Sequence, residues 1–219
     1  MKRYYAIVGA GGHGRETMPL AKAALADRIA SGEAEIFFVV ESGFPTGEIN
    51  GSKVISLDAF KDLLGPKFFN VAIANSSARE RIASHCVESR MEPFSIVAQN
   101  SIVLDNTLIG IGCILSPFTA VTSNVRIGKF FHANNFSNIA HDCVIGDFVT
   151  FGPGVKCNGN VHIGDHAFIG AGAVLKQGSP ENPLVIGRGA VVGLGAVVTK
   201  DVLPDTTVVG NPARLITHR

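Results

Sequence analysis

Residues 127–146, IGKFFHANNFSNIAHDCVIG, place an aliphatic or small apolar side chain at every sixth position. Glycine often follows the aliphatic residue directly, and four residues after it stands Ser, Thr, Cys, Ala or Val in nearly every repeat. Such a repeat predicts a triangular parallel β-helix with one inward aliphatic side chain per flat side, glycine at the corners and three repeats per coil. The aliphatic series comprises Val97, Val103, Ile109, Leu115, Val121, Ile127, Ala133, Ile139, Ile145, Phe151, Cys157, Ile163, Ile169 and Leu175.

The six-residue spacing breaks once and then resumes. After Leu175 the next aliphatic residues in register are Ile186, Val192 and Val198. The segment SPENP at 179–183 accounts for the break as an insertion of five residues, which should project as a loop. Pro204 is expected to close the repeats and to leave VVGNPARLI as a tail.

The first part of the chain follows a different pattern. Apolar strands alternate there with helical stretches, which is typical of a parallel α/β unit. The segment 45–51 is rich in turn residues, and Ser77 to Glu80 spell a capping box that would begin the last helix. We therefore expect two domains, a small α/β domain at 1–92 and a β-helix domain with its tail at 93–219. The expected strands are 4–10, 36–41 and 68–74, and the expected helices are 15–30, 57–64 and the segment from 77.

Composition excludes several classes of protein. The 219 residues carry a net charge of +1, so no basic surface is available to bind nucleic acid. No apolar run is long enough to span a bilayer, and the N-terminus does not resemble a signal peptide, so the cytoplasm is the expected location. The four cysteines lack CxxC spacing, which favours packing over disulfide or metal chemistry.

Three motifs carry a family resemblance. AHDCVIGDF at 140–148, GVKCNGNVHIGD at 154–165 and GNPAR at 210–214 resemble the PglD and NeuD type of bacterial sugar acyltransferases. That family includes the bacillosamine and perosamine N-acetyltransferases, and the likeness covers essentially the whole chain. It implies a Rossmann-like N-terminal domain, a left-handed β-helix of hexapeptide repeats, a homotrimer, acetyl-CoA as cosubstrate and a nucleotide sugar as substrate.

His141 and Asp142 are the candidate catalytic pair. His141 stands third in its repeat, where the side chain points away from the interior, and an imidazole beside a carboxylate can take a proton from an attacking amine or hydroxyl. By spacing alone the pair fits an ordinary solvated histidine better than a catalytic one, but the family's catalytic histidine and acidic residue fall on these positions. The resemblance also assigns Gly159 as the backbone donor to the oxyanion, although a glycine at a coil corner would serve packing alone.

The resemblance extends to binding residues of the β-helix. Thr150, Ala171 and, once the insertion is allowed for, Leu194 match positions that contact acetyl-CoA, and Asn134 matches a position near the acceptor sugar. His162 and His166 lie in repeats where their spacing does not converge, so no metal site is expected.

The N-terminal glycines suggest a phosphate site. Gly9, Gly11 and Gly14 form GxGxxG between a strand and a helix, but a domain this short cannot hold both halves of a dinucleotide fold. A sugar nucleotide is the better ligand, and a tight turn that binds nothing is the alternative. The predicted contacts are Gly12, His13 and Gly14 with the phosphates, Glu41 with the base or ribose, and Asn75 closing the site.

Together these features predict an acetyl-CoA-dependent N-acetyltransferase. Its substrate would be a nucleotide-linked amino sugar, of the 4-amino-4,6-dideoxy type, in surface glycan or polysaccharide biosynthesis. Two alternatives remain at this point, namely O-acetylation of a sugar hydroxyl as in NeuD-like relatives, and a noncatalytic trimeric scaffold. Exposed aromatic residues on the flat sides, expected to include Phe130, Phe131 and Phe136, also favour a trimer.

Overall fold

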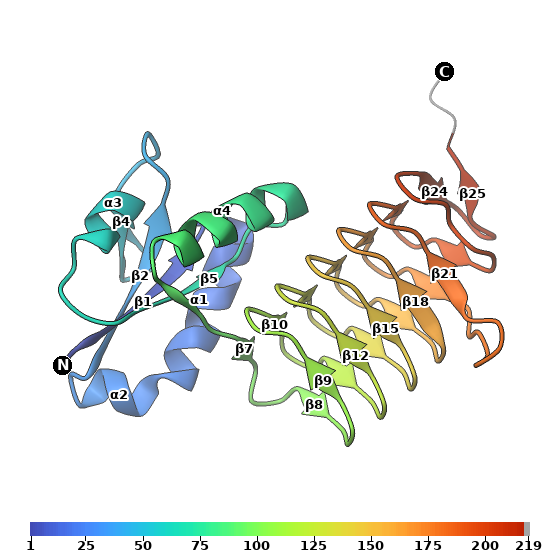
Figure 1. Ribbon diagram of the computed structural model, residues 1–219, viewed down its shortest axis with the longest axis horizontal. Helices are drawn as coiled ribbons and strands as arrows, with labels where there is room; N and C mark the ends of the chain where they lie inside the picture. The colour runs from blue at the N-terminus through green and yellow to red at the C-terminus, as the bar shows by residue number, and fades with distance from the viewer. Residues whose placement is uncertain (217–219) are drawn as a thin grey trace. The chain divides into compact units, whose positions relative to one another are not determined.

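The computed structural model describes residues 1–216 and separates into two compact units (Figure 1). The first unit is Met1–Val97, and the second begins at Ala98. The first continues past residue 92 because strand β6 (Glu92–Pro93) pairs with its sheet. No helix in the described part of the chain is long and apolar enough to cross a membrane.

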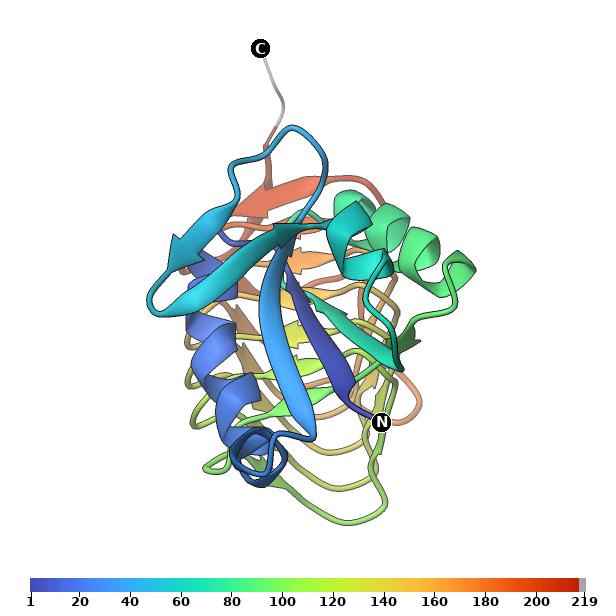
Figure 2. The ribbon, with the colours of Figure 1, turned by 90° about the vertical axis from the view of Figure 1, so that its left-hand side faces the viewer.

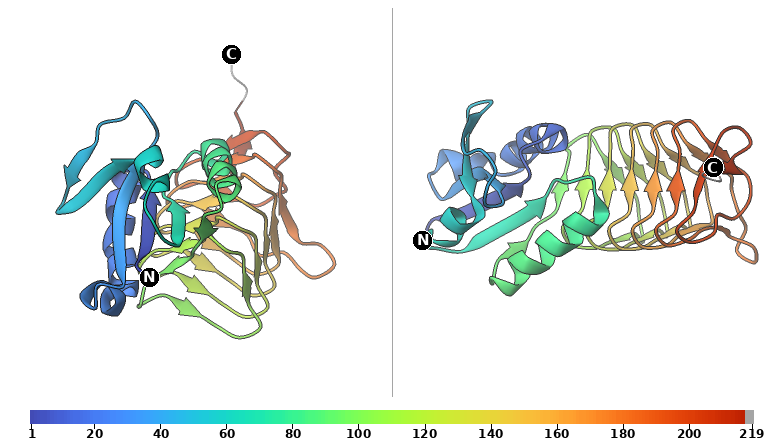
Figure 3. Two further views of the ribbon diagram at one scale, coloured as in Figure 1. Left: turned by 60° about the vertical axis from the view of Figure 1, so that its left-hand side comes forward. Right: turned by 90° about the horizontal axis from the view of Figure 1, so that it is seen from above.

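The first unit is a parallel sheet with helices on both faces. The strand order is β3-β4-β2-β1-β5-β6, and only β3 is antiparallel to its neighbour. Helices α1 and α4 lie on opposite faces of this sheet (Figures 2 and 3). The bounds are β1 (Arg3–Val8), α1 (Gly12–Ala24), α2 (Ala26–Ala30), β2 (Ala34–Val40), β3 (Gly47–Ile49), β4 (Ser52–Ser56), α3 (Leu57–Lys61), β5 (Lys67–Val71), α4 (Ser76–Glu88), β6 and β7 (Ile96–Val97).

The central strands are apolar because both of their faces are covered. Residues 5–8 of β1 and 36–40 of β2 are buried, as expected for a parallel sheet between two helical layers. From β1 the chain crosses to β2 on one side, whereas β5 pairs with β1 on the other side. The carboxyl ends of the strands at such a reversal form the usual ligand crevice of an open α/β sheet.

Three expectations for this unit are corrected by the structure. The helix expected at 15–30 begins at Gly12 and is interrupted at Leu25. The turn-rich segment 45–51 contains β3, which forms a hairpin with β4. The capping box at Ser77 is wrong, because the helix begins one residue earlier and Asn75 Oδ1 accepts a hydrogen bond from Ala78 N at 2.8 Å.

The second unit is a parallel β-helix with three flat sheets. Each strand pairs with the strand one coil further on, as Asn138 does with Lys156 and Val144 with His162. The successive coils are visible edge-on in Figure 3. The strands are β8 (Ile102–Val103), β9 (Leu108–Ile109), β10 (Ile114–Leu115), β11 (Ala120–Val121), β12 (Arg126–Ile127), β13 (His132–Ala133), β14 (Asn138–Ile139), β15 (Val144–Ile145), β16 (Thr150–Phe151), β17 (Lys156–Cys157), β18 (Val161–Ile163), β19 (Phe168–Ile169), β20 (Val174–Leu175), β21 (Leu184–Ile186), β22 (Val191–Val192), β23 (Val197–Val198), β24 (Thr207–Val209) and β25 (Arg214–Leu215).

The core of the β-helix is built from two positions of each repeat. The aliphatic residues from Leu115 to Val198 are buried, and so are the residues four positions after them, except Ser179 at the start of the insertion. The prediction is wrong for Val97 and Val103 at the start of the series, which are exposed, and Ile109 is half-buried. From Leu115 onward the periodicity predicted the core correctly, because a side chain that repeats at one place in every coil faces one continuous interior.

Glycine has two roles in the repeats, one at the corners, as expected, and one between coils. The left-handed corner conformation falls three residues after the aliphatic position, on glycines such as Gly154 and Gly172 and on residues such as Asn124, Asp142 and Phe148. The glycines that directly follow the aliphatic residues serve close packing between coils instead. A Cβ on Gly128, for example, would lie 2.7 Å from the backbone nitrogen of Asp147 in the next coil.

The insertion and the C-terminal end change the length of individual coils. The segment 179–183 forms a loop that projects between β20 and β21 (Figure 1), and strand pairing across it joins residues 23 apart, as in Val174 with Val197. Pro204 does not close the repeats. Strand β24 follows it and pairs with β22, and antiparallel β25 then ends the sheet.

Two of the three phenylalanines expected to be exposed are buried. Phe131 is fully inside the β-helix, with its ring edge-on to that of Phe151. Phe130 lies at a corner, where its ring stacks on that of Phe148. Phe136 is 58% exposed, as expected.

Candidate active site

The pair formed by His141 and Asp142 lies at a corner of the β-helix. Ile139 is buried in the core, and His141, two residues later, has a side chain that is 49% exposed. Asp142 adopts a φ of 59°, the left-handed conformation of the corner. In this arrangement His141 Nδ1 lies 2.7 Å from Asp142 Oδ2. A neutral ring that donates its Nδ1 proton to the carboxylate carries its lone pair on Nε2, which can then accept a proton.

Gly159, one coil further on, lies against the reactive edge of the ring. A side chain here would place its Cβ 2.5 Å from both Nε2 and Cε1 of His141. The carbonyl of Gly159 accepts a hydrogen bond from Gly178, whereas within residues 1–216 no acceptor engages its N–H. A backbone donor and a proton acceptor thus lie side by side.

Asn124 is a contact of this site that the sequence analysis missed. Hydrogen bonds from His141 first, and then from the side chain of Asn124, hold the pKa of Asp142 below its ordinary value despite an opposing effect of desolvation. The carboxylate therefore remains charged well into the acidic range. A usable signal was present in the sequence, because Asn106, Asn124, Asp142 and Asn160 recur at a spacing of one coil.

The three residues assigned to acetyl-CoA differ in exposure. Thr150 is only 4% exposed and pairs with His132 and Phe168 in its sheet, so little of it is available to a ligand. Ala171 is half-buried, whereas Leu194 is 76% exposed. Gly195 N donates to Ala171 O in the adjacent coil, which places Ala171 and Leu194 at neighbouring positions on one edge.

Asn134, assigned to the acceptor sugar, is partly engaged by the β-helix itself. Its backbone N–H and its side-chain Nδ2 both donate to the carbonyl of Phe151, each at 3.0 Å. These bonds leave the side-chain oxygen pointing away from that carbonyl. In the described residues, no group of three or more His, Cys, Asp or Glu side chains is arranged to hold a metal ion.

Two glycines of the N-terminal motif are required for close packing, whereas two others are surrounded by open space. Gly9 has a φ of 110°, and a Cβ on Gly14 would lie 1.9 Å from the carbonyl oxygen of Gly9, so these two glycines allow α1 to pack tightly against the end of β1. Around Gly11 and Gly12, in contrast, a Cβ would meet nothing within 4 Å. Gly11 is the N-cap of α1 and supplies no side-chain cap. The first N–H groups of this helix suit an anion.

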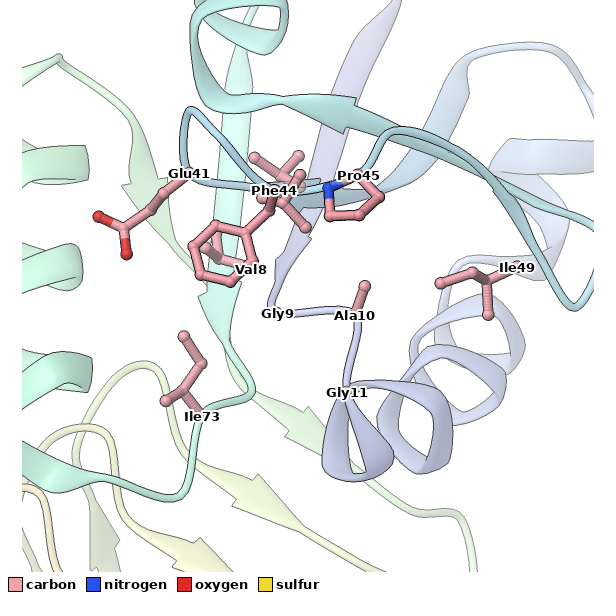
Figure 4. Close-up of a pocket in the computed structure, with 11 residues that line it drawn as sticks. Val8, Gly9, Ala10, Gly11, Glu41, Phe44, Pro45, Ile49 and Ile73 are labelled. Carbon is pink, nitrogen blue, oxygen red and sulfur yellow. The ribbon is translucent and has the colours of Figure 1, made fainter.

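A cavity of about 420 Å³ adjoins this motif at the carboxyl ends of β1 and β2 (Figure 4). Its walls are mostly apolar and include Phe44, Pro45, Ile49 and Ile73, and the backbone of 9–11 forms one side. An apolar cavity beside a helix N-terminus suits a nucleotide, because the base can pack on apolar side chains while the phosphates meet N–H groups.

Glu41 is already engaged by a partner from α4. Arg81 donates two hydrogen bonds to its carboxylate, at 2.7 and 3.0 Å, and this interaction lowers the pKa of Glu41. The carboxylate turns away from Ala10 and Ile49 across the cavity (Figure 4). Glu41 thus lines the cavity chiefly through its backbone and side-chain stem, and ties the end of β2 to α4.

The remaining predicted contacts of the first unit lie around the start of α4. Asn75 caps that helix through its side-chain oxygen. Arg79, which the sequence analysis did not single out, is fully buried and donates to the carbonyl of Ile73 at 2.7 Å, which holds the loop after β5. Burial lowers the pKa of His13, so its ring is neutral at pH 7.

A β-helix of six-residue repeats that presents a histidine and carboxylate beside a glycine backbone defines an acyltransferase of the hexapeptide-repeat class. Comparisons with known proteins agree. The family model of the PglD N-terminal domain matches residues 5–86. The GDP-perosamine N-acetyltransferase of Escherichia coli O157:H7 is 49% identical to this chain, over 96% of the chain and 95% of the relative.

Solved structures extend the likeness to the whole fold. WeeI from Acinetobacter baumannii AYE has a TM-score of 0.93 and 47% identity, covering 98% of this chain and 100% of its own. The acetyltransferase domain of PglB from Neisseria gonorrhoeae FA1090, solved in complex with acetyl coenzyme A, has a TM-score of 0.86 and 28% identity, covering 99% of this chain and 100% of its own.

The chain belongs to the PglD/NeuD type of bacterial sugar acyltransferases, in the branch of the bacillosamine and perosamine N-acetyltransferases. The predicted fold, a small Rossmann-like domain followed by a left-handed parallel β-helix, is confirmed. Membership of a family of acetyltransferases also argues against a noncatalytic scaffold.

Proposed function

We propose that this protein transfers an acetyl group from acetyl-CoA to the amine of GDP-perosamine or of a closely related nucleotide-linked 4-amino-4,6-dideoxy sugar. The likeness to a GDP-perosamine N-acetyltransferase over nearly the full length of both chains supports the acceptor. The likeness to a domain solved with acetyl coenzyme A supports the donor. The product would be an N-acetylated sugar nucleotide for surface polysaccharide or glycan synthesis.

The observation that carries this proposal is the contact of His141 with Asp142 on one side and Gly159 on the other. The amine nitrogen attacks the thioester carbonyl and forms the C–N bond, and the carbonyl electron pair moves to the oxygen, where the N–H of Gly159 stabilises it. His141 Nε2 takes the proton that the nitrogen loses. When the intermediate collapses, the C–S bond breaks and the imidazolium returns the proton to the coenzyme A sulfur.

The two substrates would bind through different parts of the chain. Ala171 and Leu194 offer the exposed edge for acetyl-CoA, with a smaller contribution from the buried Thr150. The cavity of the first unit would take the nucleotide, with its phosphates at the backbone of Gly12, His13 and Gly14. Glu41 and Asn75 would shape that cavity from the ends of β2 and β5, and Asn134 would lie near the sugar.

The enzyme would act as a homotrimer in the cytoplasm, where acetyl-CoA and nucleotide sugars are both supplied. Phe118 and Phe136 support the trimer, because their rings stack on each other at 5.0 Å and each is more than half exposed in the single chain. A stacked, exposed aromatic pair at the corners of adjacent coils is suited to burial by a second copy of the chain.

The test is release of free coenzyme A thiol from acetyl-CoA in the presence of a panel of sugar nucleotides. GDP-perosamine should support turnover, and UDP- or dTDP-linked 4-amino sugars should be poorer substrates. Failure of every amino sugar nucleotide to release thiol would refute the proposed activity.

A further inference from the structure

A ladder of short polar side chains runs along the corner that carries Asp142. Asn106, Asn124, Asp142 and Asn160 occupy equivalent positions in four successive coils, with φ angles of 50°, 63°, 59° and 55°. Asparagine and aspartate tolerate this left-handed conformation better than other residues with side chains. Backbone geometry alone therefore accounts for the residue types but not for the contacts between them.

A hydrogen bond within this ladder fixes the orientation of Asn124. Asn106 Nδ2 donates to Asn124 Oδ1 at 2.6 Å, which fixes the amide of Asn124 with its oxygen toward Asn106 and its NH₂ group toward the next coil. Asp142 occupies the equivalent corner position in the next coil, so the NH₂ group of Asn124 faces its carboxylate, and this interaction helps to lower the pKa of Asp142. The same carboxylate accepts from His141 Nδ1 at 2.7 Å.

A second donor matters because Asp142 is exposed. Its side chain is 44% accessible, and a single bond to a half-exposed histidine would leave the carboxylate free to rotate toward water. A second donor to the carboxylate restricts that rotation, and in doing so it fixes the orientation of the imidazole.

We propose that Asn124 is a positioning residue of the active site, which, oriented by Asn106, holds the carboxylate of Asp142 in place for His141. This inference rests on the proposed function, in which His141 takes the proton of the acceptor amine. It predicts that removal of Asn124 slows the chemical step without changing how either substrate binds.

The main variant is Asn124→Gly, since glycine tolerates the φ of 63° and the backbone is not strained. The kcat should fall about tenfold, the size expected for loss of one hydrogen bond to a charged group, while KM for both substrates stays unchanged. Asn124→Asp keeps an oxygen that can accept the hydrogen bond from Asn106, but it removes the NH₂ donor and places a second negative charge beside Asp142. The kcat of this variant should therefore fall at least as far as that of Asn124→Gly. Asp205→Gly, at another corner with a φ of 55°, is the matched control and should keep full activity.

A double-mutant cycle separates positioning from general damage. In a chain that already carries Asp142→Gly, the additional Asn124→Gly change should have no further effect on kcat, because its target is gone. The inference would be overturned if the double variant lost kcat by the product of the two single factors, or if KM in Asn124→Gly rose as much as kcat fell. Either result would leave the proposed function intact.

A crystal structure of Asn124→Gly gives a readout that does not depend on turnover. The expected result is an Asp142 carboxylate in more than one orientation or displaced from His141 Nδ1. A contact retained at the wild-type distance with a single carboxylate orientation would overturn the inference, even if the wild-type enzyme proved to have another activity.

Discussion

His141 is exposed because Ile139, two residues before it, is committed to the core of the β-helix. The repeat thus displays a polar pair without interrupting the apolar interior. This much follows from the sequence, since the position of a residue within its repeat decides whether it faces inward or outward. The contact with Gly159 also follows once coils of eighteen residues are recognised.

Replacing His141 with Asn should lower kcat by roughly two to four orders of magnitude, the usual contribution of a positioned general base. Binding of acetyl-CoA and the melting temperature should be unchanged, because the ring is half exposed and outside the core. His162→Asn, also exposed but outside the candidate site, is the control and should retain activity. Near-normal turnover of His141→Asn at neutral pH would show that another group is the base.

Gly159→Ala should impair catalysis more than folding. The new Cβ would collide with Nε2 and Cε1 of His141, and the exposed ring can relieve the collision by swinging away. A displaced catalytic group costs on the order of a hundredfold in rate, so kcat should fall by about that factor with little change in melting temperature. A variant with normal kcat would mean that the ring does not need its observed position.

At the scale of single elements, the glycines that follow the aliphatic residues allow the coils to stack closely. In Gly128→Ala the Cβ would meet the backbone of residues 146–147, which cannot move aside as a side chain can. Overpacking of this kind typically costs about 1–3 kcal/mol. Thermal denaturation should therefore show a clear loss of stability in Gly128→Ala and almost none in Gly159→Ala; equal melting temperatures would contradict this account of the repeats.

The ion pair between Glu41 and Arg81 ties β2 to α4, and its contribution should depend on pH. The pKa of Glu41 is lowered in the folded protein, so the stabilisation is complete above the unfolded pKa of about 4.3 and is lost as the pH falls through the folded value. Because the pair is exposed to solvent, which screens its attraction, the effect should be small. Glu41→Gln should lower the free energy of unfolding at pH 7 but not at pH 3; an equal deficit at both would point to another cause.

The sequence predicted elements well where one periodicity dominates and less well where a local contact decides. The core positions from Leu115 to Val198 follow from spacing alone. The Asn75 cap was missed because Ser77 offers an equally plausible pattern, and only the backbone decides which residue begins the helix. Phe131 was misplaced because its position four residues after Ile127 usually holds a smaller side chain. Asn124 was missed because its contact joins side chains that are neighbours only after the coils have stacked.

For the whole molecule, assembly is the first expectation. Light scattering should give a mass three times that of the 23.0 kDa chain, because the stacked Phe118 and Phe136 would otherwise remain in water. A stable monomer with full activity would contradict the proposed trimer.

The nature of the acceptor is the central claim, and one pair of substrates tests it most directly. A sugar amine is a competent nucleophile when neutral and needs only a base to accept its proton, whereas a neutral hydroxyl is a weaker nucleophile and depends more strongly on removal of its proton. The measurement is kcat/KM for GDP-perosamine and for the analogue that differs only in carrying a hydroxyl in place of the amine. We expect the amine to be acetylated faster; faster acetylation of the hydroxyl compound would contradict the assignment as an N-acetyltransferase.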